Sequence, residues 1–302
     1  MASQTLREIA IEHAKKRPEL VDYLTKKAPI LDAMKWVPAT HGLWNVEEVL
    51  SQVNGAGMVD LDAPLPSMDA STRLETTYVS VMGGRLEVGV DKAAQFGGPD
   101  AYFSRREEKF FNMAGMDTEK GIYSNYWRKA ALKSKAFEKC GGSGSALSTI
   151  MVVKMDSHIN TGIYDPAGFK QGRLMEVSPL YGGNKYLDAQ GRTVYGVEYR
   201  GRFGWQILAP KECVFGLVNI DADHLPTLAM IEDAIAAVEG DASDTMIFGY
   251  APILQKTFSA IKQADIMYVN GDKSIQTIVG DINGVKLIGS YNVSKLNEAA
   301  VA

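Results

Sequence analysis

Two pairs of aspartates have a spacing that could support acid–base or metal chemistry: Asp60 with Asp62, and Asp221 with Asp223. Alternate residues of a strand lie on one face of it, so either pair could converge on a cation. Aspartates are also common in the turns that follow strands, where their side chains accept hydrogen bonds from nearby backbone N–H groups. We favour the turn interpretation for both pairs and expect neither a metal ion nor a cofactor.

A glycine-rich segment at 141–145 shares only its composition with a phosphate-binding loop. It lacks the Gly-Lys-Ser/Thr ending and precedes a predicted strand where such a loop precedes a helix, so we interpret it as a connector. The sequence contains no Gly-x-Ser-x-Gly elbow, and nothing in it pairs Cys140 or Cys213 with a histidine as a nucleophile. The sequence therefore favours a protein without catalytic residues over an enzyme.

The composition is that of an ordinary folded protein, with 302 residues, 46% hydrophobic and 23% charged, and a net charge of −4. That length allows one large domain or two modest ones. The lysines between 129 and 139 could touch phosphates, but a solvated helix face is their more ordinary role, and we expect no sequence-specific DNA binding. The N-terminus lacks the apolar core of a signal peptide, and no stretch is apolar enough to span a membrane, so we expect synthesis in a cytoplasm.

Two short helices are predicted at the N-terminus. Thr5 and Glu8 form a capping box at the start of a helix over 5–16, and a proline opens a second helix over 18–27. The stretch that follows, 29–70, is rich in proline and has little regular periodicity, which indicates a long excursion with an interaction role.

The strongest helical pattern begins at Asp100, and Gly115 is a plausible end for it. Its aromatic residues recur at helical spacing and indicate a face packed on the core: Tyr102, Phe103, Phe110 and Phe111. Two further helices are predicted after Pro226 and over 252–264.

Strand patterns fill much of the remaining sequence. Residues 71–90 alternate with period two, and we expect the glycines at 83 and 84 to turn the chain there. Residues 141–223 alternate between strands and turn signals, and Asn283-Gly284 predicts a hairpin near the C-terminus. Because the helices do not alternate strictly with the strands, the sequence predicts an α+β protein.

Five motifs occur in a fixed order along nearly the whole chain. They are PILDAMKWVP at 29–38, MGGRLEV at 82–88, Gly162-Ile163-Tyr164-Asp165-Pro166, Phe203-Gly204-Trp205 and Asn219-Ile220-Asp221. Each motif alone is weak, but their order and spacing resemble those of a group of tailed-bacteriophage major capsid proteins.

That resemblance implies the Hong-Kong-ninety-seven-type capsid fold, an α+β fold with four parts. The expected boundaries are an N-terminal arm over 1–39, an extended β-ribbon loop over 40–85, a peripheral domain with a long spine helix over 86–139 and 265–302, and an axial domain over 140–264.

The resemblance also implies a function. It predicts a protein that assembles into the pentamers and hexamers of an icosahedral phage head around double-stranded DNA, located in the virion after assembly in the host cytoplasm. The implied partners are other copies of the chain, a separate scaffold protein and a portal, with a cement protein as a further candidate. Two alternatives stay open: another virion protein, of the tail tube or a decoration, and a hydrolase acting through Asp221 and Asp223.

The residues expected to hold copies together lie in the arm and the extended loop, because these parts reach beyond their own core. Large apolar and aromatic side chains dominate the energetics of buried interfaces. The candidates for contacts between subunits are Trp36, Trp44, Leu20, Leu24, Leu50 and Met58.

Overall fold

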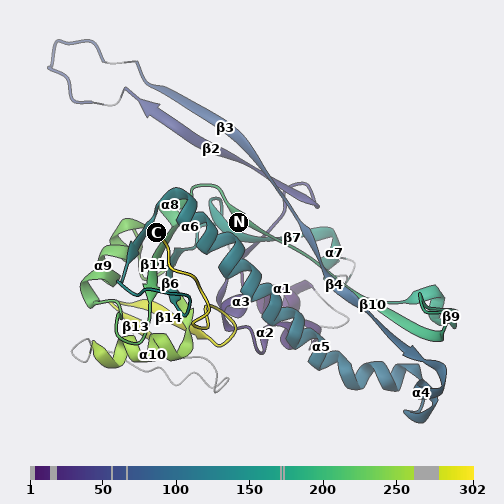
Figure 1. Ribbon diagram of the computed structural model, residues 1–302. Helices are drawn as coiled ribbons and strands as arrows, with labels where there is room; N and C mark the ends of the chain where they lie inside the picture. The colour runs from purple at the N-terminus through teal and green to yellow at the C-terminus, as the bar shows by residue number, and fades with distance from the viewer. Residues whose placement is uncertain are drawn as a thin grey trace.

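The computed structural model describes residues 4–13, 19–55, 57–65, 67–170, 172, 174–261 and 279–302. Over these ranges the chain forms two six-stranded sheets, a two-stranded ribbon that projects from them, and helices packed against the sheets (Figure 1). The prediction of an α+β protein is confirmed.

The first sheet is organised around one long strand, β10 (Thr193–Ile207). Strand β4 (Ser80–Gly89) pairs along one side of it in antiparallel register, and three shorter strands share the other side. A further short strand, β1, pairs in parallel with β7. The bounds of the shorter strands are β1 Trp36–Pro38, β7 Asn160–Tyr164, β8 Met175–Pro179 and β9 Tyr186–Leu187.

The second sheet has the strand order β13-β14-β12-β6-β11-β5. Its strands are β5 Phe137–Lys139, β6 Ser148–Lys154, β11 Val214–Ile220, β12 Thr245–Tyr250, β13 Val279–Ile282 and β14 Val285–Ser290. All residues of β6 except the last are buried, as expected for an apolar run in the centre of a sheet. The predicted hairpin is confirmed, because Asn283 and Gly284 join β13 to β14 with φ values of 52° and 81°.

Two predicted helices cover the second sheet: α9 (Leu228–Ala237) and α10 (Ala251–Ala260). Thr227 caps α9, since its side chain accepts a hydrogen bond from the backbone N–H of Met230. The part of the helix predicted over 252–264 that follows residue 261 lies outside the described residues.

The long central helix is α5 (Pro99–Gly121), which continues without a break as the π-helix η1 (Ile122–Arg128) and then α6 (Lys129–Ser134). The expectation that Gly115 ends this helix is wrong. A Cβ atom at Gly115 would lie 1.9 Å from the carbonyl oxygen of Leu24, so the glycine lets helix α2 (Glu19–Thr25) pack directly on α5.

The N-terminal segment packs into the body, because Leu6, Ile9 and Ile30 are fully buried. The predicted capping box is confirmed: Glu8 accepts from the N–H of Thr5 at 2.8 Å, and the Thr5 hydroxyl accepts from the N–H of Glu8 at 3.4 Å. The remaining short helices are α1 Leu6–His13, α3 Pro29–Ala33, α4 Val90–Gln95, α7 Pro166–Lys170, η2 Leu180–Gly183 and α8 Pro210–Cys213. Residues 14–18, where the first predicted helix ends and the second begins, lie outside the described residues.

The projecting ribbon consists of β2 (Trp44–Asn54) and β3 (Asp69–Tyr78), paired in antiparallel register (Figure 1). The alternation predicted from residue 71 onward is confirmed, but the turn predicted at Gly83 is wrong. Strand β4 runs straight through this position, where a Cβ atom would lie 1.9 Å from the carbonyl oxygen of Tyr199. The glycine therefore permits the close approach of β4 and β10.

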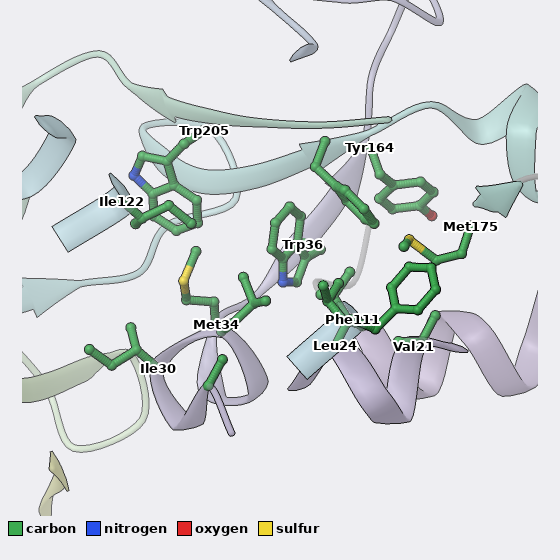
Figure 2. Close-up of a cluster of buried hydrophobic side chains, with 14 of the residues drawn as sticks. Val21, Leu24, Ile30, Met34, Trp36, Phe111, Ile122, Tyr164, Met175 and Trp205 are labelled. Carbon is green, nitrogen blue, oxygen red and sulfur yellow. The ribbon is translucent and has the colours of Figure 1, made fainter. Parts of the chain in front are cut away.

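Four aromatic side chains connect the two sheets: Trp36, Trp205, Trp127 and Phe248, which we call the tryptophan core. Their ring centroids are separated by 6.2, 5.6 and 4.8 Å in that order. Trp36 and Trp205 point into the same apolar cluster as Met34 and Ile122 (Figure 2). A Cβ atom at Gly162, opposite Trp36 across the β1–β7 pair, would lie only 2.4 Å from the indole ring, so this glycine makes room for Trp36.

Strand pairing groups the residues differently from the boundaries expected from the sequence. The expected axial segment, 140–264, includes β7 to β10 of the first sheet, in which β7 pairs with β1 and β10 pairs with β4. The expected peripheral segment, 265–302, includes β13 and β14, which extend the second sheet beside β12. The reason is that β10 reaches across the molecule to pair with β4, a long-range contact that local sequence signals do not reveal.

Candidate assembly surface

Exposed apolar side chains are concentrated in and beside the ribbon. Among the side chains described between 43 and 81, ten large apolar ones have more than a third of their surface exposed: Leu43, Trp44, Met58, Val59, Leu61, Leu65, Met68, Leu74, Tyr78 and Val81. Monomeric proteins rarely leave a large contiguous apolar patch open to water, and such patches commonly mark interaction sites.

The two faces of the ribbon differ in chemistry. Trp44 lies opposite Tyr78 in the register, and Leu74 is on the same face of β3 as Tyr78 because alternate residues share a face. The other face of β3 carries Arg73 and Glu75, which form an ion pair at 2.7 Å. One face therefore carries the large apolar side chains Trp44, Leu74 and Tyr78 with Glu48 and Thr76 between them, and the opposite face of β3 is charged.

The root of the ribbon is fixed to the first sheet by buried polar contacts. Asn45 is 1% exposed; its side-chain N–H donates to Gln206 at 2.8 Å, and its carbonyl oxygen accepts from the N–H of Thr40 at 3.1 Å. Nearby, the ring of His41 stacks on Trp44 with centroids 5.7 Å apart. These contacts set the direction in which the ribbon leaves the body.

The segment that joins β2 to β3, described over residues 57–65 and 67–68, forms the ribbon tip. Within these ranges it exposes five large apolar side chains: Met58, Val59, Leu61, Leu65 and Met68. The joining segment carries two aspartates, at positions 60 and 62, and no lysine or arginine. The N–H of Ala63 donates to the carbonyl of Asp60 at 3.0 Å, which agrees with the turn interpretation for the Asp60 pair.

A groove of about 610 Å³ lies between the ribbon root and the body, and we call it the root groove. One wall is the polar face of β3, with Arg73, Glu75 and Thr77. The other wall is formed by η1, α6 and the end of β10, with these groove residues: Asn125, Tyr126, Lys129, Ala130, Lys133, Ser134, Trp205, Ile207, Leu208 and Pro210.

The predicted contact residues fall into two groups. Leu20, Leu24 and Trp36 are at most 2% exposed and lie in the chain's own core, which corrects the expectation that they face another subunit. Trp44 is 40% exposed and Met58 is fully exposed, so both are available. The sixth candidate, at position 50, belongs to β2, and its side chain lies outside the described residues.

Sequence reasoning missed most of the exposed tip and Leu74 and Tyr78. The period-two alternation of residues 71–90 puts Leu74 and Tyr78 on one face of the strand, so the sequence does carry a signal for their shared side. No periodicity marks the tip, because its apolar residues lie outside the paired strands.

The second aspartate pair also forms a turn, as expected. The Asp221 carboxylate accepts hydrogen bonds from the backbone N–H groups of Asp223 and His224, at 2.9 and 2.8 Å, and contacts the His224 ring at 2.9 Å. The hydrogen bond to His224 is the main reason that the pKa of Asp221 lies below its usual value. These contacts occupy the carboxylate locally and give Asp221 and Asp223 no shared ligand geometry.

The two cysteines are free thiols, and burial raises the pKa of each to about 12. A thiol with so high a pKa is a poor nucleophile at neutral pH. Over the described ranges, no group of three or more His, Cys, Asp or Glu side chains is arranged to hold a metal ion. Within the same ranges, no helix combines the length and apolar character needed to cross a membrane.

One buried carboxylate joins three distant segments. Glu119 of α5 accepts hydrogen bonds from the backbone N–H of Ile30 at 2.8 Å, from the Ser290 hydroxyl at 3.0 Å and from the Asn292 amide. It is fully buried, and this burial raises its pKa to about 7 despite the three donors. Glu119 therefore ties the N-terminal segment, the central helix and the C-terminal tail together.

No protein-family model matches the sequence, and no curated protein matches it either. The structure is similar to a near-atomic cryo-EM structure of bacteriophage epsilon15, with 16% identity and a TM-score of 0.54 over 90% of this chain and 88% of the other. It also matches the capsid of bacteriophage JBD30, with 10% identity and a TM-score of 0.46 over 85% and 88%, respectively. A third match is the SrpI encapsulin complex of Synechococcus elongatus, with 11% identity and a TM-score of 0.43 over 73% and 97%.

Of these three, the bacteriophage epsilon15 structure has a TM-score above 0.5, and its similarity to this chain is one of fold. The phage-capsid fold expected from the sequence is supported by this similarity, and the finer Hong-Kong-ninety-seven-type division into four parts stays a prediction.

Proposed function

We propose that the protein is a major capsid protein that assembles into the pentamers and hexamers of an icosahedral phage head around double-stranded DNA. The observation that supports this proposal is the exposed ribbon, a long projection with uncovered large apolar side chains at its root and tip, on a chain with a phage-capsid fold. The fold supports a shell protein, and the exposed apolar side chains of the ribbon support a subunit that is covered by another copy.

An isolated two-stranded ribbon is marginally stable in water, and the ribbon here has only its own two strands and its root contacts. Covering its apolar face would remove Trp44, Leu74 and Tyr78 from water, and each large apolar side chain contributes roughly 1.5–3 kcal/mol when fully buried. A second copy of the chain is the natural cover, because subunits in a ring meet through two different patches.

The candidate contact residues in this proposal are Trp44, Met58 and the rest of the ribbon tip. Leu20, Leu24 and Trp36 act instead inside each subunit. These separate roles for buried and exposed residues suit a shell protein, since the body must fold before the ribbon can dock on another copy.

The other partners follow from the same proposal. The net charge of −4 suits an inner wall that encloses DNA without gripping it through phosphate contacts. A separate scaffold protein and a portal would direct assembly in the host cytoplasm, and a cement protein could bind the finished head. The location of the assembled protein would be the virion.

Size-exclusion chromatography and electron microscopy of the purified protein test the proposal. Closed shells or rings of five and six subunits are expected. A matched variant replaces the four most exposed apolar residues of the tip with serine (M58S, L61S, L65S and M68S) and should remain folded but largely unassembled. A wild-type chain that stays monomeric at all salt and protein concentrations, with and without co-expressed scaffold, would contradict the proposal.

A further inference from the structure

The root groove concentrates positive charge on its body side. Lys129 and Lys133 are one helical turn apart on α6, so they are neighbours on one side of the helix, and both are exposed where they line the groove. Over the described ranges, neither lysine takes part in an ion pair. Like charges at this spacing repel each other, so an anion between the two side chains would be stabilising.

The ribbon side of the groove adds a third cation. Arg73 of β3 lines this wall and pairs with Glu75 at 2.7 Å, and Glu75 is the one carboxylate among the described residues of the lining. The arginine side chain is nevertheless 60% exposed, which leaves part of its guanidinium group open to a second acceptor. An anion in the groove would therefore meet positive charge from both walls.

The neutral residues of the groove indicate what kind of anion fits. The volume of about 610 Å³ lies within the range of small-molecule sites, about 300–1,000 Å³. Asn125 is exposed and offers amide N–H donors, and the ring of Tyr126 is 43% exposed beside it. The Ser134 hydroxyl already donates to the backbone carbonyl of Ala130 at 2.8 Å, so the donors for a ligand are the cations and Asn125.

A phosphate group matches this lining better than a carboxylate does. It carries a charge of about −1.5 to −2 at pH 7 and three acceptor oxygens, so one group can accept hydrogen bonds from several cations at once. A flat ring attached to the phosphate would also have the face of Tyr126 to stack on.

We propose that the root groove binds a small phosphate-bearing anion, held by Lys129 and Lys133 on one wall and by Arg73 on the other. This inference goes beyond the proposed function, because it assigns a ligand site to the single subunit. One wall belongs to the ribbon and the other to the body, so the bound anion also links the two. It does so beside the buried root contact, since Thr77 of the groove lies opposite Asn45 in the strand register.

Isothermal titration calorimetry of unassembled subunits with pyrophosphate and with ATP tests the site, at an ionic strength of about 0.15 M so that weak surface attraction is screened. One ligand per subunit is expected. K129Q/K133Q should weaken binding at least about tenfold, because two charge-assisted contacts are lost. The matched control is K185Q/K256Q, which removes the same charge at two exposed lysines outside the groove lining and should bind like the wild type.

Two variants of β3 test whether the ligand reaches the ribbon wall. Arg73→Gln should weaken binding about two- to fivefold, the size of one exposed charge contact. Glu75→Gln should strengthen binding by a similar factor, because it removes the carboxylate of the lining and frees Arg73. Damage to the fold would weaken binding in both variants, so opposite signs identify a direct electrostatic contact. Circular dichroism checks that each variant is folded.

Tyr126→Ala distinguishes the two sources of phosphate. A loss of affinity for ATP alone would identify a nucleotide-type ligand, and equal affinities of the variant and the wild type for both anions would identify a ligand without a ring. Three results would overturn the site: no saturable binding of either anion, K129Q/K133Q binding like the wild type, or a duplex oligonucleotide binding more tightly than both small anions. Because the titration uses single subunits, a wild-type chain that binds the anion but forms no particles would contradict the proposed function alone.

Discussion

Trp36 and Trp44 lie close together in the sequence, in the consecutive strands β1 and β2, yet one side chain is buried and the other is exposed. Trp36 is 2% exposed and meets Phe203 and Trp205 edge to face. Trp44 is 40% exposed, and its stacking partner is the neighbouring His41. Tryptophan contributes strongly to the stability of both hydrophobic cores and interfaces, so its presence in a sequence does not show which of the two it belongs to.

The difference comes from the layers around each strand. Strand β1 belongs to a sheet that packs on helices, and Gly162 leaves room for the Trp36 ring. In the part of the chain that the structure describes, β2 pairs with β3 alone, and no second layer covers Trp44, Leu74 and Tyr78. The apolar side chains of the body are buried within one chain. Under the proposed function, those of the ribbon would be buried by another copy.

The largest expected change in stability tests whether Trp36 belongs to the core of the body. Trp36→Ala removes a ring from the tryptophan core and should lower the free energy of unfolding by about 3–5 kcal/mol. Urea denaturation of unassembled subunits measures the change. A loss below about 1 kcal/mol would mean that Trp36 does not belong to the core.

A second prediction contrasts the buried carboxylate of the body with the exposed carboxylates of the tip. Burial raises the pKa of Glu119 from 4.5 to about 7, so folding takes up a proton between these values. The unfolding free energy should therefore fall by about 3 kcal/mol as pH rises through this window, and the full penalty applies above pH 7. Lys295 is the charged neighbour that most opposes the shift.

Glu119→Gln should flatten the stability profile between pH 5 and pH 8 by about that amount, as measured by urea denaturation at several pH values. The control is Glu108→Gln in the same helix, because its pKa lies below the usual value through a hydrogen bond with Lys26. That variant should keep the wild-type decline over this window. Parallel curves for wild type and Glu119→Gln would show that the carboxyl does not titrate there.

Local signals in the sequence predicted much of the fold. The capping box at Thr5 and Glu8, the Asn283-Gly284 hairpin and the alternation before Tyr78 each depend on residues close together in the chain, and each is confirmed. The turn at Asp221 was predicted for the same reason.

Long-range contacts account for the errors. Gly83 was predicted to form a turn and Gly115 to end a helix. Instead, each lets a backbone segment distant in the sequence approach closely, at Tyr199 and at Leu24. The burial of Trp36 depends on β7, and the root groove depends on residues of β3, α6 and β10. Such contacts bring together segments far apart in the sequence, so no local periodicity could reveal them.

A third prediction tests the close packing that distinguishes the body from the ribbon. Gly115→Ala places a methyl group against the carbonyl of Leu24 and should destabilise unassembled subunits by about 1–3 kcal/mol, because α2 must move away. Gly121→Ala in the same helix is the matched control, since its Cβ would meet no atom within 4 Å. The control should stabilise the subunit by about 0.5–1 kcal/mol through helix propensity. Equal effects of the two substitutions in thermal unfolding would argue against the α2–α5 contact.

The smallest expected effect on the subunit concerns Trp44. Trp44→Ala removes a partly exposed ring whose stacking partner is His41, so the unfolding free energy of unassembled subunits should change by less than about 1.5 kcal/mol. The yield of assembled particles should nevertheless fall, because the same ring would be buried by another copy in the shell. Paired measurements of unfolding and assembly on Trp36→Ala and Trp44→Ala separate the two roles. If Trp44→Ala destabilised the subunit as strongly as Trp36→Ala, the ribbon would be part of the folded core, and the case for completing its packing through assembly would fail.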